Sequence, residues 1–144
     1  MFKSILTQEE LLSMPESAYM NEAQLDFFER HINDEIKGCY KRVSALTKEL
    51  HDLKYNGQVE IIDQAYTMAE ISLKAKELTN YNVRLKALEN ALTHIKDGSY
   101  GYCDYSGDEI GLKRLLINPA TILSFEEQEK REKGTDEKGT HSDW

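Results

Sequence analysis

The chain is poor in cysteine, in long apolar runs and in basic charge. Its 144 residues include two cysteines, Cys39 and Cys103, which form no C-x-x-C pair, so a disulfide framework is excluded. No apolar stretch approaches transmembrane length and no signal-peptide core is evident, so we expect a cytoplasmic protein that does not enter a membrane. The net charge of −8 disfavours direct binding to duplex DNA, which requires a basic face.

The balance of apolar and charged residues is that of an elongated helical protein. Hydrophobic residues make up 40% of the chain and charged residues 31%, which is low in apolar content for a compact globule but usual for the narrow seam of a coiled coil. An acidic protein is suited to a basic surface or channel. The sequence contains no catalytic triad, phosphate-binding loop or metal-ligand cluster, so we do not expect an enzyme.

Two long segments carry apolar residues at the alternating three- and four-residue steps of a coiled-coil seam. The first predicts a helix over residues 21–53, with Asn21 as its N-cap and Gln24 reaching back in a capping box. The second follows the turn signal Tyr55-Asn56-Gly57 and ends near Gly98, which is placed for the left-handed position after a helix. Helices of similar length joined by a short loop predict an antiparallel hairpin.

The composition changes along the chain predict four parts. These are a lead-in with a short helix (1–20), the coiled-coil hairpin (21–97, with its tip at 54–65), a small globular head with a C-terminal helix (98–133) and a disordered tail (134–144). Thr7 to Glu10 fits a capping box for the first short helix, and Ser124 to Glu127 fits one for the last. A short hairpin is expected around Ser106-Gly107.

Two acidic residues lie at the tip of the predicted hairpin. Glu60 and Asp63 are three residues apart, so their carboxylates share one face of a helix. On these residues alone, the favoured interpretation is a pair of first-turn acids that suit the helix dipole. Ala65, two residues further on, is by itself an ordinary core alanine.

Three stretches of the chain form a specific combination in this order and spacing. They are Tyr19-Met20-Asn21-Glu22-Ala23-Gln24-Leu25, the tip Glu60-x-x-Asp63-x-Ala65, and the stretch from Tyr100-Gly101-Tyr102-Cys103 through Gly107-x-Glu109-Ile110-Gly111-x-x-Arg114-Leu115 to Pro119. Together they resemble the DksA/TraR family of bacterial RNA polymerase regulators, whose tip reads D-x-x-D-x-A. The resemblance covers Tyr19 to Lys133.

The resemblance implies a mainly α fold, with a long antiparallel coiled-coil helical hairpin, a small zinc-finger-like globular head and a C-terminal helix. It implies that the hairpin enters the secondary channel of bacterial RNA polymerase and brings Glu60, Asp63 and Ala65 toward the catalytic centre. Family members change open-complex stability in this way, often together with ppGpp, without specific DNA binding. We expect a monomer, because the hairpin satisfies its own seam.

The head departs from the two C-x-x-C pairs with which zinc-binding family members hold their metal. Those four positions fall on Cys103, Ser106, Ser124 and Glu127, so one cysteine of four remains. A structural zinc site is closed by four ligands, usually thiolates or imidazoles, and the scattered histidines do not fill the gaps by spacing. The head is therefore expected to be metal-free and zinc-independent, which would suit zinc starvation or thiol oxidation.

The cations that the family places near ppGpp also differ. Asn118, Ala87 and Gln128 stand at three of those positions. The remaining candidates for contacts at the polymerase rim or near ppGpp are Arg84, Lys86, Lys113 and Arg114, because phosphates need cationic partners. For Arg84 and Lys86, a solvated helix surface is the ordinary alternative.

Two other functions stay open. A Gre-like factor uses a similar hairpin to place acids on the catalytic Mg²⁺ of RNA polymerase and so promotes transcript cleavage. A structural coiled-coil module would instead pair with another chain. Cleavage of nascent RNA would support the first of these, and self-association would support the second.

Overall fold

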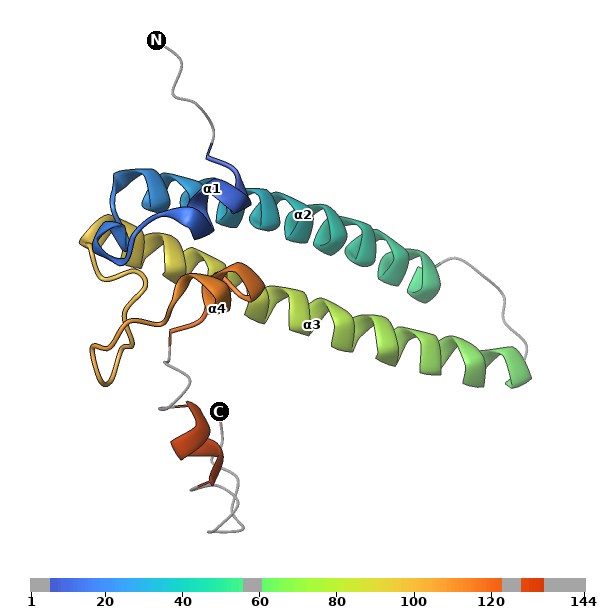
Figure 1. Cartoon of the computed structure of the whole chain (residues 1–144). Coiled ribbons are helices and arrows are strands. Elements are labelled where there is room, and N and C mark those ends of the chain that lie inside the picture. Colours follow the sequence, from blue (N-terminus) through green and yellow to red (C-terminus); the bar gives the residue numbers. More distant parts are fainter. Residues whose placement is uncertain (1–5, 56–60, 123–127, 134–144) are drawn as a thin grey trace. The chain divides into compact units, whose positions relative to one another are not determined.

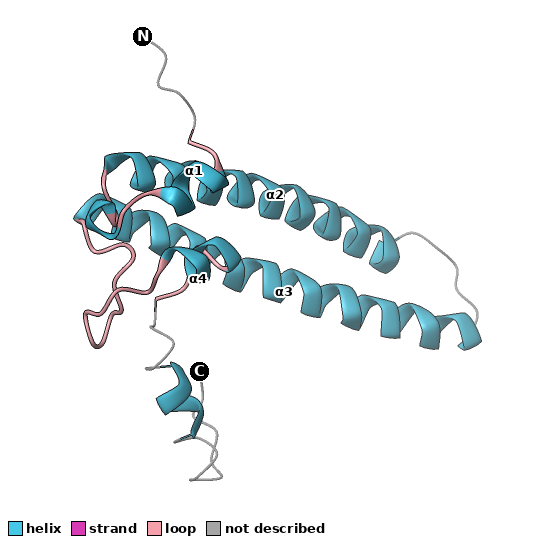
Figure 2. Ribbon diagram, in the orientation of Figure 1, coloured by secondary structure: helices cyan, strands magenta, loops and turns pink. Residues whose placement is uncertain are grey.

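The computed structural model describes residues 6–55, 61–122 and 128–133, and it leaves the side chains of residues 61–63 undescribed (Figure 1). Its elements are α1 (Gln8–Ser13), the 3-10 helix η1 (Glu16–Ala18), α2 (Glu22–Tyr55), α3 (Ile61–Asp97) and α4 (Leu112–Ile117). Residues 128–133 are also helical. Within the described ranges, strand-type pairing is limited to an isolated bridge between Tyr102 and Glu109 (Figure 2). The prediction of a mainly α fold is confirmed.

The chain divides into two compact units. One comprises Met1–Ile32 and Asn90–Trp144, and is termed the base unit; the other comprises Asn33–Glu89 and is termed the arm. The predicted separation into a hairpin of residues 21–97 and a head of residues 98–133 stays a prediction. Among the described residues, no helix is long and apolar enough to cross a membrane.

The arm is an antiparallel pair of helices, formed by the second part of α2 and the first part of α3 (Figure 1). Ion pairs join Glu35 to Arg84, Arg42 to Glu77 and Glu49 to Lys74, so residue numbers rise along α2 while they fall along α3. Each pair is seven residues from the next on α2, which is the heptad repeat of a coiled coil. The buried apolar side chains between the helices belong to the predicted seam: Cys39, Leu46, Leu50, Leu85 and Leu88.

The start of α2 is capped by two side chains of the base unit. The backbone N–H of Gln24 donates to Asn21 Oδ1 at 2.9 Å, which confirms Asn21 as the N-cap. The Gln24 side chain reaches back as predicted, but its Oε1 accepts from the backbone N–H of Met20 at 2.8 Å. At α1, the Thr7 hydroxyl accepts from the backbone N–H of Glu10 at 3.2 Å, so this predicted cap is also confirmed.

The core of the base unit forms where α2, α3 and the segment after α3 meet. Phe28 is fully buried, and its ring centroid lies 5.6 Å from that of the buried Tyr100. The Tyr100 hydroxyl donates to the Pro119 carbonyl at 2.8 Å. Gly98 has a φ of 85°, and the N–H groups of Ser99 and Tyr100 both donate to the His94 carbonyl, so Gly98 ends α3 as the sequence predicts.

Candidate functional site

The predicted tip lies at the start of α3. Glu60 is outside the described residues, α3 begins at Ile61, and the side chain of Asp63 is among those not described. Ala65 is exposed. The pairing of the two carboxylates therefore stays a prediction. The Ser124–Glu127 cap and the tail of residues 134–144 also lie outside the described residues.

One of the cations predicted to contact the polymerase rim or ppGpp, Arg84, forms an ion pair within the arm. The Arg84 guanidinium donates to Glu35 Oε2 at 2.7 Å, so Arg84 stabilises the pairing of α2 with α3. The ammonium of Lys74 donates to Glu49 Oε2 at 2.8 Å and holds the pKa of that carboxyl below its ordinary value, while the carboxylate raises the pKa of Lys74. Lys86, by contrast, is exposed and can reach a partner molecule.

Backbone hydrogen bonds close the turn that contains Cys103, the first of the four positions at which zinc-binding family members carry a cysteine. The N–H of Cys103 donates to the Asp108 carbonyl at 2.8 Å, and the N–H of Gly107 donates to the Cys103 carbonyl at 2.9 Å. Gly107 has a φ of 74°, a conformation that glycine adopts without strain. The hairpin expected around Ser106-Gly107 is thus present, with the Tyr102–Glu109 bridge as its pairing.

The donor groups of this turn do not fit a four-thiolate zinc site. Cys103 supplies one thiol and is 4% exposed. The Ser106 hydroxyl, a weak metal ligand, accepts from the backbone N–H of Asp108 at 3.3 Å. No group of three or more histidine, cysteine, aspartate or glutamate residues in the described ranges could hold a metal ion.

Other contacts join the parts of the head. The N–H of Asp104 donates to the Ile122 carbonyl at 2.9 Å, which ties the Cys103 turn to the segment before the second family pair. The Arg131 guanidinium lies 3.8 Å from the centroid of the Tyr105 ring, a cation–π contact from the last helical segment. Arg114 also donates to Gln128 of that segment. These contacts join the Cys103 turn and α4 to later segments of the head.

His94 connects the end of α3 with the same turn. Its Nδ1 lies 2.6 Å from Ser99 Oγ, and its Nε2 lies 3.7 Å from Asp104 Oδ1. Ser99 donates from both its backbone N–H and its hydroxyl to Asp97 Oδ1, and these bonds hold the pKa of Asp97 below its ordinary value. The cluster resembles a hydrogen-bonded cap on the C-terminal end of α3.

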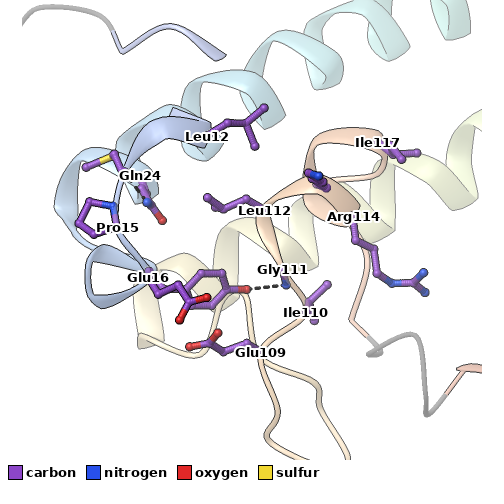
Figure 3. A pocket seen from close by; sticks show the side chains of 13 residues that line it. Leu12, Pro15, Glu16, Gln24, Glu109, Ile110, Gly111, Leu112, Arg114 and Ile117 are labelled. Carbon is purple, nitrogen blue, oxygen red and sulfur yellow. Dashed lines mark hydrogen bonds between the residues drawn. The ribbon is translucent and has the colours of Figure 1, made fainter. Parts of the chain in front are cut away.

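A cavity of about 740 Å³ opens between the α1–η1 segment and α4 (Figure 3). Leu12, Pro15 and Leu112 form apolar walls, and Glu16 and Glu109 add two carboxylates to the lining. It is lined by these and by Met14, Tyr19, Gln24, Ile110, Gly111, Lys113, Arg114 and Ile117. Lys113 and Arg114 are therefore brought together here, but the two carboxylates disfavour a polyphosphate in the same cavity.

Tyr19 shapes the wall of this cavity, and sequence reasoning assigned it no role of its own. Its hydroxyl donates to the Gly101 carbonyl at 2.6 Å and accepts from the Gly111 N–H at 2.9 Å, the bond dashed in Figure 3. Burial raises the pKa of the phenol above its ordinary value, so it stays neutral and can donate. A tyrosine two residues before a helix N-cap carries no local signal for bonds to residues 82 and 92 positions away.

Comparison with known proteins identifies relatives of one kind. Residues 98–133 match the family described as "Prokaryotic dksA/traR C4-type zinc finger". The chain is 29% identical over 119 residues to the "RNA polymerase-binding transcription factor DksA" of Caulobacter vibrioides, covering 80% of each chain. It is 30% identical over 112 residues to the proteins of the same name from Salmonella typhimurium and Escherichia coli K12, covering 78% of this chain and 74% of theirs.

A solved structure extends the similarity to the whole fold. The structure of "transcription factor DksA2 from Pseudomonas aeruginosa" superimposes with a TM-score of 0.82 at 32% identity, covering 90% of this chain and 99% of that one. The agreement confirms the predicted coiled-coil hairpin with a zinc-finger-like head. The matched domain is described as having four cysteines, whereas Cys103 is the one cysteine of residues 98–133 here.

Proposed function

Because this chain belongs to the DksA/TraR family, we propose that it is an RNA polymerase-binding transcription factor that inserts the tip of its arm into the secondary channel of the polymerase. The observation that carries the proposal is the coiled-coil arm with its heptad-spaced seam. The relatives that share this chain's sequence are named for binding to RNA polymerase. The protein would act in the cytoplasm as a monomer, without specific contacts to DNA.

The proposed mechanism is a shift in the stability of the open promoter complex. The acidic tip, with Glu60, Asp63 and Ala65, would be attracted into a channel that admits nucleotides and is therefore expected to be basic. There it would favour one arrangement of mobile polymerase elements over another. A differential contact of about 1–2 kcal/mol changes such populations by roughly 5–30-fold. The ion pairs along the arm support this role because they fix the antiparallel alignment of the two helices.

Coupling to ppGpp is proposed only through the polymerase rim. Lys86 is exposed on α3, and Lys113 and Arg114 belong to α4, so these cations are the candidates for contacts with a nucleotide shared with the polymerase. Arg84 is a weaker candidate, because its guanidinium is engaged by Glu35. Glu16 and Glu109 line the same cavity as Lys113 and Arg114, and their negative charge opposes the binding of phosphates there. We therefore expect this chain to contribute less to ppGpp binding than family members that have the full set of cations.

The test is the lifetime of an open complex at a ribosomal promoter, measured with RNA polymerase in the presence and absence of this protein. We expect a shorter lifetime that survives a metal chelator. Asp63→Asn should remove most of the effect, because it neutralises a tip carboxylate with little change in shape. Asp34→Asn, an equally conservative change at an exposed position of α2, is the matched control and should keep it.

An unchanged lifetime with folded protein would contradict the proposal. Cleavage of nascent RNA by stalled polymerase on addition of the protein would instead support a Gre-like factor. Loss of activity in both variants would indicate general charge dependence, because Asp34 lies far from the tip motif in the sequence.

A further inference from the structure

One face of α3 next to the tip is apolar and exposed. Residues 64–73 contain a single charged side chain, Glu70, in a chain of which 31% is charged. Tyr66 is 75% exposed and Leu73 is 70% exposed, and Ala69 between them is also exposed. These three residues are termed the outer stripe. Large apolar side chains that gather on a surface mark contact sites.

The seam of the arm does not account for the outer stripe. Tyr66, Ala69 and Leu73 are spaced i, i+3 and i+7, so they lie on one face of the helix. The seam runs through Ile71 and Leu78 toward the buried Leu85. Ile71 follows Tyr66 by five residues, so the seam lies about 140° around the helix from the stripe. The stripe therefore faces away from α2.

The stripe is continuous with the tip. Tyr66 follows Ala65 of the tip motif directly, and Leu73 lies about 18 Å along the helix from Ile61 at roughly 1.5 Å per residue. An arm that enters a channel with its tip first carries this segment into the same channel. Electrostatic attraction to basic walls does not act on uncharged side chains, so the stripe requires an apolar surface as its partner.

We infer that the outer stripe packs against an apolar wall of the secondary channel of bacterial RNA polymerase and supplies affinity that the acidic tip does not. This inference rests on the proposed function. A second copy of the chain fits the stripe less well, because the stripe spans about two helical turns and ends at Lys76 and Asn80, whereas paired helices need an apolar repeat over three or more heptads.

The test compares two sets of substitutions on the same helix. Tyr66→Gln with Leu73→Gln removes the apolar stripe, adds no charge and retains a good helix former. Val83→Gln is the matched control, since Val83 is 63% exposed and lies about 25 Å further from the tip than Tyr66. The readouts are the equilibrium affinity of a labelled protein for RNA polymerase and the open-complex lifetime at saturating protein.

We expect the double variant to bind polymerase about tenfold or more weakly, and the control to bind within about twofold of the wild type. At saturation the double variant should still shorten the open-complex lifetime, because its tip is unchanged. Circular dichroism of each variant establishes that the helices are retained, and the two single variants serve if the double variant loses helix.

Equal affinity of the double variant and the wild type would overturn the inference and leave the proposed function intact. Absence of polymerase binding by the wild type would overturn both. A wild-type dimer that dissociates in the double variant, seen by sedimentation, would assign the stripe to a second copy and overturn the polymerase contact. An equal loss in the Val83→Gln control would show that any exposed apolar residue of α3 matters, which also overturns it.

Discussion

At the scale of single residues, Tyr19 joins parts of the base unit that are distant in sequence. Its hydroxyl bonds to the carbonyl of Gly101 and the N–H of Gly111, both of which are glycines with positive φ. At Gly101 an added Cβ would lie 2.7 Å from the Met20 side chain, so the close approach of these two segments requires glycine. The phenol and the glycine together position the head on the start of α2.

Tyr19→Phe should destabilise the base unit. The change removes one donated and one accepted hydrogen bond while keeping the ring. It leaves the Gly111 N–H without its partner, whereas the Gly101 carbonyl keeps the bond that it accepts from the Ile110 N–H at 2.8 Å. We expect a loss of about 1–3 kcal/mol in the free energy of unfolding, measured by urea denaturation. Tyr102→Phe is the control, because the Tyr102 ring packs edge-on against Tyr19 but its hydroxyl bonds to none of the described residues. Equal losses in the two variants would contradict the role assigned to the Tyr19 hydroxyl.

At the scale of elements, the arm depends on an apolar seam with charged pairs beside it. Leu46 and Leu88 are fully buried, and the hydrophobic effect makes the larger contribution to the pairing. The charged pairs Glu49–Lys74 and Arg42–Glu77 are partly exposed and contribute less, but opposite charges face each other only in the observed antiparallel register. They therefore contribute mainly to specificity of alignment.

The Glu49–Lys74 pair should make the stability of the arm depend on pH. Lys74 lowers the pKa of Glu49 from its ordinary value of 4.5, so the folded state binds this proton less tightly than the unfolded state does. The contribution is thus present above about pH 4.5 and is lost as the pH falls through the lowered folded value. Compared with Glu49→Gln, the wild type should have the higher thermal midpoint at pH 7, and the difference should vanish in acid.

Glu29→Gln is the control for the pH series, since Glu29 is exposed on α2 and forms no ion pair among the described residues. Its midpoint should follow that of the wild type across the series. A difference between the wild type and Glu49→Gln that persists unchanged in acid would contradict the assignment to the ionised carboxylate.

At the scale of the whole molecule, the head combines a zinc-finger-like fold with a donor set that does not suit zinc. One thiol, Cys103, remains from the four-cysteine pattern, and Ser106 is committed to its own turn. The hydrogen bond from the Asp104 N–H to the Ile122 carbonyl and the contact of Arg131 with the Tyr105 ring join the Cys103 turn to later segments of the head. Cys103 is the one cysteine of residues 98–133, so this part of the chain carries no thiolate cluster that oxidation could disrupt.

Removal of metal should leave the protein folded. We expect the thermal midpoint measured in a strong chelator to equal that measured with added zinc, and elemental analysis of purified protein to find much less than one zinc per chain. The Escherichia coli relative provides the positive control if its head binds zinc. A midpoint that falls in chelator and recovers with zinc would contradict the interpretation and would indicate ligands beyond Cys103.

The sequence by itself determined the two long helices, the caps at Thr7 and Asn21 and the antiparallel pairing of the long helices. Heptad spacing, the Asn21 cap and Gly98 act within one or two turns of chain, so their outcome can be read locally. The acidic tip was also found in this way, and it stays a prediction. Local patterns likewise indicated the turn around Ser106-Gly107.

Only the tertiary structure decided which of these residues are engaged and which are exposed. It paired Arg84 with Glu35, joined Tyr19 to two glycines, and left Tyr66 and Leu73 on the outer face of α3. Three- and four-residue spacing on α3 is compatible with more than one apolar face, and the choice of seam depends on α2. These outcomes follow from contacts between residues many positions apart, whose energies no short window of sequence contains.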